Sequence, residues 1–114
     1  MEQEKKLHIL WTNADINTSL HMVMMYATNC MLRGWWDAVT VIVWGAPAKL
    51  VAENEDVQKR IGMAIHAGVK FSACIGCSRQ LGVVEQLDAL GIPSVSWGPA
   101  LTSLIQEKQP LITI

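Results

Sequence analysis

Short apolar runs alternate with longer amphipathic stretches along the chain. The runs "KLHILWT" and "AVTVIVW" are rich in β-branched and aromatic residues, which is typical of strands. Together with three further runs they predict strands over 6–12, 38–44, 69–74, 92–97 and 110–114. Between them, the periodicity and the glycines at positions 34, 68 and 91 predict helices over 17–33, from 46 onward, 55–67, 77–90 and 99–106.

This order of elements predicts a fold class. Strands that alternate with helices form a mainly parallel sheet with helices on both faces. We therefore predict an α/β protein with a three-layer α/β/α arrangement and a five-stranded sheet. No linker, repeat or change in composition divides the chain, so a single domain over residues 1–114 is expected.

Composition and charge exclude several classes of protein. Hydrophobic residues make up 51% of the chain and charged residues 17%, which is typical of a folded domain rather than a disordered one. A formal net charge of −1 argues against a nucleic-acid partner. No apolar run approaches the roughly 20 residues of a membrane span. The N-terminal stretch "MEQEKK" lacks the apolar part of a signal peptide, so a cytoplasmic location with reduced cysteines is expected.

The helix expected over 17–33 is apolar on nearly all sides. Such a helix is buried on more than one side, either in the core alone or in the core and a subunit interface. Trp35 and Trp36 follow it and cannot both easily face the core. With so few charged residues on a small surface, this pattern favours a homo-oligomer.

The carboxyl ends of parallel strands form the edge at which open α/β sheets bind ligands. The sequence places two cysteines there, Cys74 and Cys77, as candidate catalytic residues. Residues that follow the other strands are predicted to line a substrate pocket, and they are Asn13, Asp15, Trp44, Gly45 and Trp97. An aspartate at this position is more often a turn or helix-cap residue than a site carboxylate, so both roles of Asp15 are considered.

The CxxC spacing in "FSACIGCSRQLG" leaves three interpretations open: inert core thiols, a reactive pair or half of a metal site. A position that opens a helix favours the thiolate, which makes Cys74 the candidate nucleophile and Cys77 its resolving partner. No second CxxC or closely spaced histidine pair supplies further ligands, so no metal ligand is predicted. The glycine-rich patterns of nucleotide sites are also absent from the sequence, and no cofactor is expected.

The segments "CIGCSRQLGVVEQLDALGIPSV" and "VIVWGAPAKLV" resemble the DsrE-like family, which includes the DsrE and TusD sulfur-transfer subunits. The resemblance implies a small α/β/α domain assembled as a trimer or hexamer. In the sulfur-transfer subunits, a cysteine eight residues before the glycine of a "GV" pair carries sulfur as a persulfide. Counting back from Gly82 gives Cys74. Cys77 departs from those subunits, although other members of the family share a second cysteine at this spacing.

The resemblance thus implies a cytoplasmic sulfur-relay protein in which Cys74 is the sulfur acceptor. Its partners would be sulfur donor and acceptor proteins, and whether it acts as a sulfurtransferase-type enzyme stays open. Two alternatives remain. One is a non-catalytic oligomeric module that binds a small ligand or metal, and the other is a CxxC dithiol redox protein.

Overall fold

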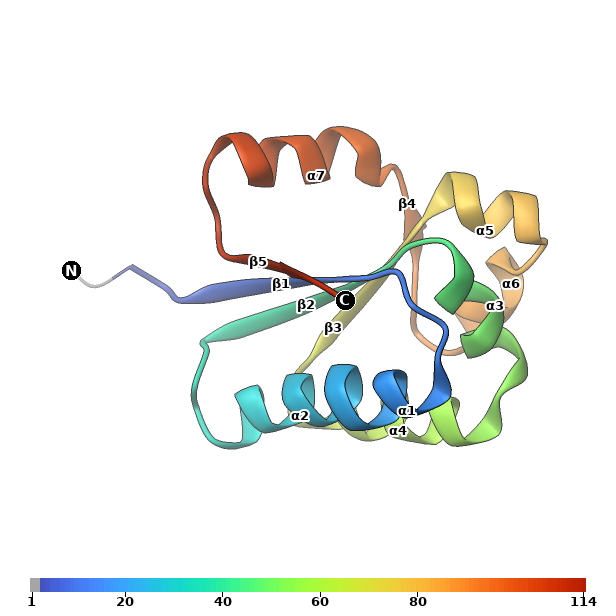
Figure 1. Ribbon diagram of the computed structural model, residues 1–114, viewed down its shortest axis with the longest axis horizontal. Helices are drawn as coiled ribbons and strands as arrows, with labels where there is room; N and C mark the ends of the chain where they lie inside the picture. The colour runs from blue at the N-terminus through green and yellow to red at the C-terminus, as the bar shows by residue number, and fades with distance from the viewer. Residues whose placement is uncertain (1–2) are drawn as a thin grey trace.

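In the computed structural model, five parallel strands form one sheet (Figure 1). They are β1 (Lys6–Trp11), β2 (Ala38–Val43), β3 (Lys70–Cys74), β4 (Ser94–Val95) and β5 (Leu111–Thr113), in the order β4-β3-β2-β1-β5. The structure describes residues 3–114, so the first two residues of the expected domain, which begin the stretch "MEQEKK", lie outside the described part. The predicted five-stranded parallel sheet is confirmed.

Helices cover both faces of the sheet, as predicted (Figure 1). On one face lie α1 (Ile16–Thr18), the π-helical segment η1 (Ser19–Met24), α2 (Met25–Leu32) and α4 (Glu55–Ala67), whereas α7 (Trp97–Gln106) lies on the other. Three shorter helices lie toward the carboxyl ends of the strands, and they are α3 (Ala46–Glu53), α5 (Ile75–Leu81) and α6 (Val84–Ala89). Within residues 3–114, no helix has both the length and the apolar character to cross a bilayer.

The main core lies between the sheet and the face covered by α2 and α4. Alternate residues of β1 point into it, and Leu7, Ile9 and Trp11 are all buried. β2 contributes a matching row, and α4 contributes Ile61 and other buried residues. The period of two in β1 therefore sets which face of this strand enters the core.

The order of the strands reverses between β1 and β5. From β1 the chain passes to β2, β3 and β4 in one direction, and α7 then returns it to β5 on the other side of β1. Ligands of open α/β sheets commonly bind at such a reversal. Here the reversal lies two strands away from β3, at whose end the cysteine pair stands.

The helix predicted over 77–90 was wrong in its bounds and in its continuity. α5 already begins at Ile75, and it ends at Gly82, whose φ of 69° is left-handed. The N–H of Gly82 bonds to the carbonyl of Arg79, and the N–H of Val83 bonds to that of Ser78. This arrangement caps α5 and forces α6 to start as a separate helix, because glycine readily adopts the conformation that ends a helix.

Two other elements also differ from the prediction. The strand expected over 92–97 is reduced to Ser94–Val95, because Pro93 has no N–H for the ladder and α7 begins at Trp97. The helix expected over 17–33 contains the π-helical segment η1, in which the buried Ser19 hydroxyl donates to the carbonyl of Asp15 at 2.7 Å. An apolar stripe with helical spacing does not distinguish this wider helix from an α-helix.

Candidate functional site

Cys74 is at once the last residue of β3 and the N-cap of α5. Its backbone is extended (φ −70°, ψ 119°), and its side chain makes no capping hydrogen bond. Cys77 follows in the first turn of α5, and residues three apart on a helix lie on the same side of it. Both cysteines are half-buried free thiols, in contrast to the fully buried Cys30. The structure therefore brings the two predicted catalytic residues together.

The sulfur of Cys74 lies over Gly76. A Cβ atom placed on Gly76 would stand 4.0 Å from Cys74 Sγ, which is an ordinary van der Waals contact. Gly76 is exposed and has no side chain, so nothing at this position shields the sulfur. Sequence reasoning did not single out Gly76, although a glycine inside a CxxC that opens a helix is a readable signal.

Burial and two neighbours act on the pKa of Cys77. Burial raises the pKa of the Cys77 thiol, the hydrogen bond with Cys74 raises it further, and the backbone N–H of Gly45 lowers it. Cys77 therefore favours its thiol form, and Cys74 and Gly45 are its neighbours.

Gly45 reaches Cys77 because of its backbone conformation. It precedes α3 with φ 81° and ψ −130°, a combination that residues with a Cβ atom adopt only at a cost of about 1–3 kcal/mol. The sequence predicted Gly45 as a residue that lines a substrate pocket. In the structure, the backbone N–H of Gly45 lies at the cysteine pair.

Two serines that the sequence did not reveal hold the site together. The buried Ser78 hydroxyl donates to the carbonyl of Cys74 at 3.0 Å, and the Ser94 hydroxyl donates to Ser78 Oγ at 3.0 Å. Cys74 also pairs with Val95 across the sheet. This network joins the end of β3, the first turn of α5 and β4. The only signal for this network in the sequence is Ser78, a serine four residues after the end of β3.

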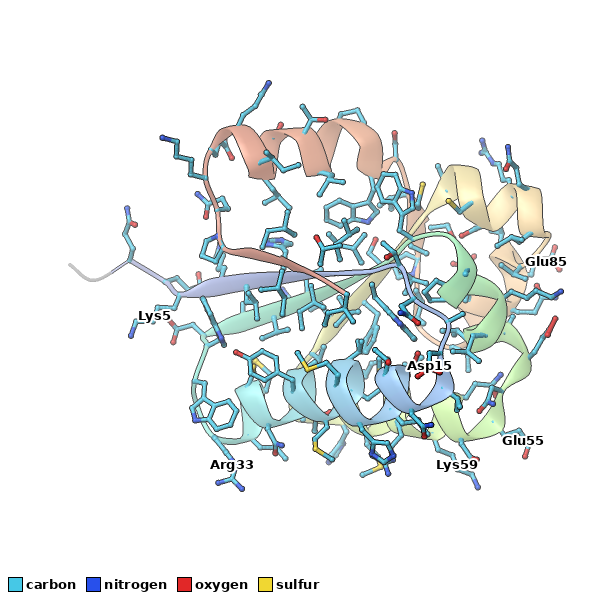
Figure 2. The ribbon with its side chains drawn as sticks, in the orientation of Figure 1. Lys5, Asp15, Arg33, Glu55, Lys59 and Glu85 are labelled. Carbon is cyan, nitrogen blue, oxygen red and sulfur yellow. The ribbon has the colours of Figure 1, made fainter. Side chains whose placement is uncertain are left out.

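Asn13 and Asp15 serve the turn after β1. The side-chain oxygen of Asn13 accepts from the N–H of Asp15 at 2.7 Å, and the Asp15 carboxylate accepts from both the N–H and the hydroxyl of Thr18 at 2.9 Å. The Thr18 N–H, followed by its hydroxyl, lowers the pKa of Asp15. Figure 2 shows Asp15 beside the start of α1. β2 separates this turn from β3, a spacing of about 10 Å between backbones, so Asp15 acts as a helix cap.

The two predicted pocket tryptophans take different places. Trp44 is half-buried directly after β2. Its backbone N–H bonds to the backbone carbonyl of Trp11 at 3.0 Å. Trp97 is the first residue of α7, and its side chain is buried. Its indole N–H donates to Ser72 Oγ at 2.8 Å. Ser72 and Cys74 face the same side of β3 because they are two residues apart. Trp97 thus covers β3 immediately before the cysteine.

The tryptophan on α7 also packs against a histidine. His8 meets Trp97 edge to face, with ring centroids 6.3 Å apart. Burial and, to a lesser degree, the charge of Lys6 lower the pKa of His8. His8 therefore lies on the sheet face under α7, where the lowered pKa favours its neutral form. Across residues 3–114, no three Cys, His, Asp or Glu side chains gather closely enough to hold a metal ion.

Comparisons with known proteins yield relatives of known structure. No family model and no curated protein sequence matches the chain. The structure of the conserved protein of unknown function BT1422 from Bacteroides thetaiotaomicron superimposes with a TM-score of 0.94 and is 36% identical, over 96% of this chain and 95% of that one. The ychN protein from E. coli matches with a TM-score of 0.75 at 14% identity, over 96% of this chain and 99% of that one.

These two matches carry different weight. The similarity to the ychN protein concerns the fold alone, and it agrees with the DsrE-like α/β architecture that the sequence predicted. The similarity to BT1422 extends to sequence over almost the full length of both chains. The chain therefore belongs to the family of the conserved Bacteroides thetaiotaomicron protein BT1422, a protein of unknown function.

Proposed function

We propose that the protein is a single-domain cytoplasmic carrier of sulfane sulfur, in which Cys74 accepts sulfur as a persulfide and passes it to an acceptor protein. The observation that carries this proposal is the position of Cys74, which ends β3 and opens α5 with its sulfur over the exposed Gly76 and Cys77 in the same turn. Sulfur transfer proceeds by attack of a cysteine sulfur on a donor persulfide, so the cysteine that a donor can reach is the candidate acceptor. The DsrE-like fold supports the same function class.

The chemistry of loading needs only the Cys74 sulfur. The Cys74 thiolate attacks the terminal sulfur of a donor persulfide, forms a new S–S bond and expels the donor as its thiolate. Delivery is the same reaction with an acceptor thiolate. The open position at Gly76 leaves room for the donor chain to approach. The dipole of α5 adds little, because this helix has only seven residues.

We further propose that the carrier is a homo-oligomer that uses the outer face of α2 and α4. A groove of about 750 Å³ runs between these helices, and its lining includes Leu32, Gly62 and Met63. Leu32 is 67% exposed and Met63 60% exposed, which is a large apolar surface for a chain with so few charges. The cysteine pair lies at the end of β3, and neither cysteine lines the groove, so both surfaces are available together.

Charge complementarity supports a second copy of this chain as the occupant of the groove. α4 starts with Glu55 and Asp56 and carries Lys59, Arg60 and His66 farther along. Figure 2 shows Glu55 and Lys59 projecting from α4 away from the sheet. When two copies of α4 pack antiparallel around a two-fold axis, the acidic start of each meets the basic part of the other. Gly62, whose Cβ position is empty, allows close approach.

The carrier function is tested by incubating the protein with a persulfide donor and measuring its intact mass. Measured immediately after loading, the wild type and Cys30→Ser are expected to gain about 32 Da, one sulfur atom, whereas Cys74→Ser gains none. Cys30 is a fair control because it is a fully buried thiol outside the pair. Uptake by Cys74→Ser at the wild-type level would show that another residue accepts the sulfur.

A further inference from the structure

The second cysteine of the pair has no part in loading or delivery as described, yet it lies against the first. We infer that Cys77 releases the sulfur carried by Cys74 as hydrosulfide and leaves a Cys74–Cys77 disulfide. This inference rests on the proposed carrier function. It concerns the case in which no acceptor protein takes the sulfur, and the product is then hydrosulfide, a small free anion.

The geometry allows the two cysteines to form a disulfide. Cys74 is the N-cap of α5 and Cys77 stands three residues later, so their Cβ atoms are neighbours on one side of the first turn, about 5–6 Å apart. A disulfide needs Cβ atoms about 3.5–4.5 Å apart, so the two residues approach by about 1–2 Å as the bond forms. Cys77 already interacts with Cys74.

The reaction balances with the groups in the site. The Cys77 sulfur attacks Cys74 Sγ, the inner sulfur of the persulfide anion, and the S–S bond to the outer sulfur breaks. The outer sulfur takes the bonding electron pair and the proton of the Cys77 thiol, and it leaves as hydrosulfide. One carried sulfur is reduced by two electrons, and the two cysteine sulfurs supply these electrons as they become a disulfide.

Gly45 is a positioning residue for this step. Negative charge develops on the Cys77 sulfur as its proton departs, and burial opposes this charge. The Gly45 N–H already donates to that sulfur and stabilises the charge where it forms. Its unusual backbone angles hold the N–H there, so the turn between β2 and α3 contributes to the reactivity of a residue on α5.

The same chemistry places the protein in a reaction sequence. A reaction that produces a protein or low-molecular-weight persulfide must supply the sulfur. A reaction that consumes hydrosulfide follows it. Each release also requires a dithiol reductant to return the Cys74–Cys77 disulfide to two thiols, with oxidation of the reductant to its own disulfide.

Release is tested by a single turnover of the full-length protein. The protein is loaded with inorganic polysulfide and desalted. Intact mass and hydrosulfide in solution are then followed over time without reductant. The wild type is expected to lose the added sulfur, finish about 2 Da below its reduced mass and release about one hydrosulfide per chain. Cys77→Ser is expected to keep its added sulfur, and Cys30→Ser to behave as the wild type.

The possible results separate release from carriage. A wild type that retains its added sulfur as long as Cys77→Ser does, with no disulfide, overturns the inference and leaves the carrier function intact. Failure of the wild type and Cys77→Ser to take up any sulfur overturns both.

A Gly45→Ala variant tests the positioning residue. We expect release about tenfold slower, which is the effect of losing one hydrogen bond to a charged group. The pH profile of release should also move to higher pH, because the N–H that lowers the pKa of Cys77 is displaced. An unchanged pH profile in folded Gly45→Ala would show that the Gly45 N–H has no role in the step.

Discussion

Cys74 and Cys77 are chemically the same residue in different surroundings. Cys74 has an open flank over Gly76. Cys77 lies in the first turn of α5, where Cys74 and the N–H of Gly45 act on its pKa. In the proposed chemistry, the sulfur with the open flank meets the donor first and Cys77 acts on it afterwards.

The open flank of Cys74 is tested by Gly76→Ala. The added methyl group would contact Sγ at about 4.0 Å without strain, so the sulfur becomes less accessible. We expect slower alkylation of Cys74 and a free energy of unfolding raised by up to about 1 kcal/mol, because alanine favours helix. Gly98→Ala on α7 is the matched control, since Gly98 is also an exposed helical glycine and its Cβ position is empty. It should stabilise the protein without slowing alkylation, and equal slowing by both variants would contradict the account.

Ser78 is expected to be the polar residue on which the site depends most. Ser78→Ala removes, at a fully buried position, the hydroxyl that donates to the carbonyl of Cys74 and accepts from the half-buried Ser94. We expect a loss of about 1–3 kcal/mol in the free energy of unfolding, measured by urea denaturation. Thr102→Ala removes a hydrogen bond of the same i to i−4 type from the exposed side of α7. That variant should lose less than about 0.5 kcal/mol, and a similar loss in both would argue against the network.

At the scale of elements, the sequence predicted where strands and helices lie better than how helices begin and end. Hydrophobic periodicity placed β1, β2, α4 and β5 within one or two residues. It joined α5 and α6 into one helix because it does not register the left-handed φ of Gly82. It also missed η1, since the wider turn depends on packing and on the Ser19 hydrogen bond to Asp15 rather than on local residue types.

The same limit applies to the candidate site. Cys74, Cys77 and Gly45 could be placed at one edge because parallel strands end together there. The roles of Asn13 and Asp15 could not, because whether a polar side chain caps its own turn depends on rotamers that no pattern encodes. Ser78 and Ser94 were missed because they are 16 residues apart and meet only after β3 and β4 pair.

The cap at the start of α1 predicts a pH-dependent stability. The hydrogen bonds from Thr18 lower the pKa of Asp15 in the folded protein below its value in the unfolded chain. The stabilisation is therefore complete above the unfolded pKa and is lost as the pH falls through the folded pKa. Asp15→Asn keeps a capping oxygen but does not titrate. We expect the melting temperature of the wild type to exceed that of Asp15→Asn by less at pH 3 than at pH 7. An identical difference at both values would contradict this role.

On the scale of the whole molecule, the two faces of the sheet are covered to different extents. The α2 and α4 face has the large core and an exposed apolar groove outside it, whereas α7 alone covers the other face (Figure 1). The cysteine pair lies at the carboxyl end of β3, away from the groove residues on α2 and α4. Self-association and sulfur chemistry can therefore be tested separately.

Self-association through the groove predicts a specific effect of Met63→Lys. A third cation beside Lys59 and Arg60, in place of an apolar contact, should shift the molar mass measured by light scattering toward that of the monomer. Ile105→Lys is the matched control, because Ile105 on α7 is 59% exposed and Met63 is 60% exposed. Dissociation by Ile105→Lys, with Met63→Lys unchanged, would place the interface on the α7 face instead.

The central claim is that Cys74 carries the sulfur, and peptide mapping of loaded Cys77→Ser tests it most directly. Trypsin cleaves after Lys70 and Arg79, so residues 71–79 form a peptide in which Cys74 is then the only cysteine. After incubation with inorganic polysulfide and alkylation, this peptide should carry one extra sulfur, about 32 Da. The peptide with the buried Cys30 should carry none. An unmodified 71–79 peptide from protein that has been exposed to excess polysulfide would contradict the account.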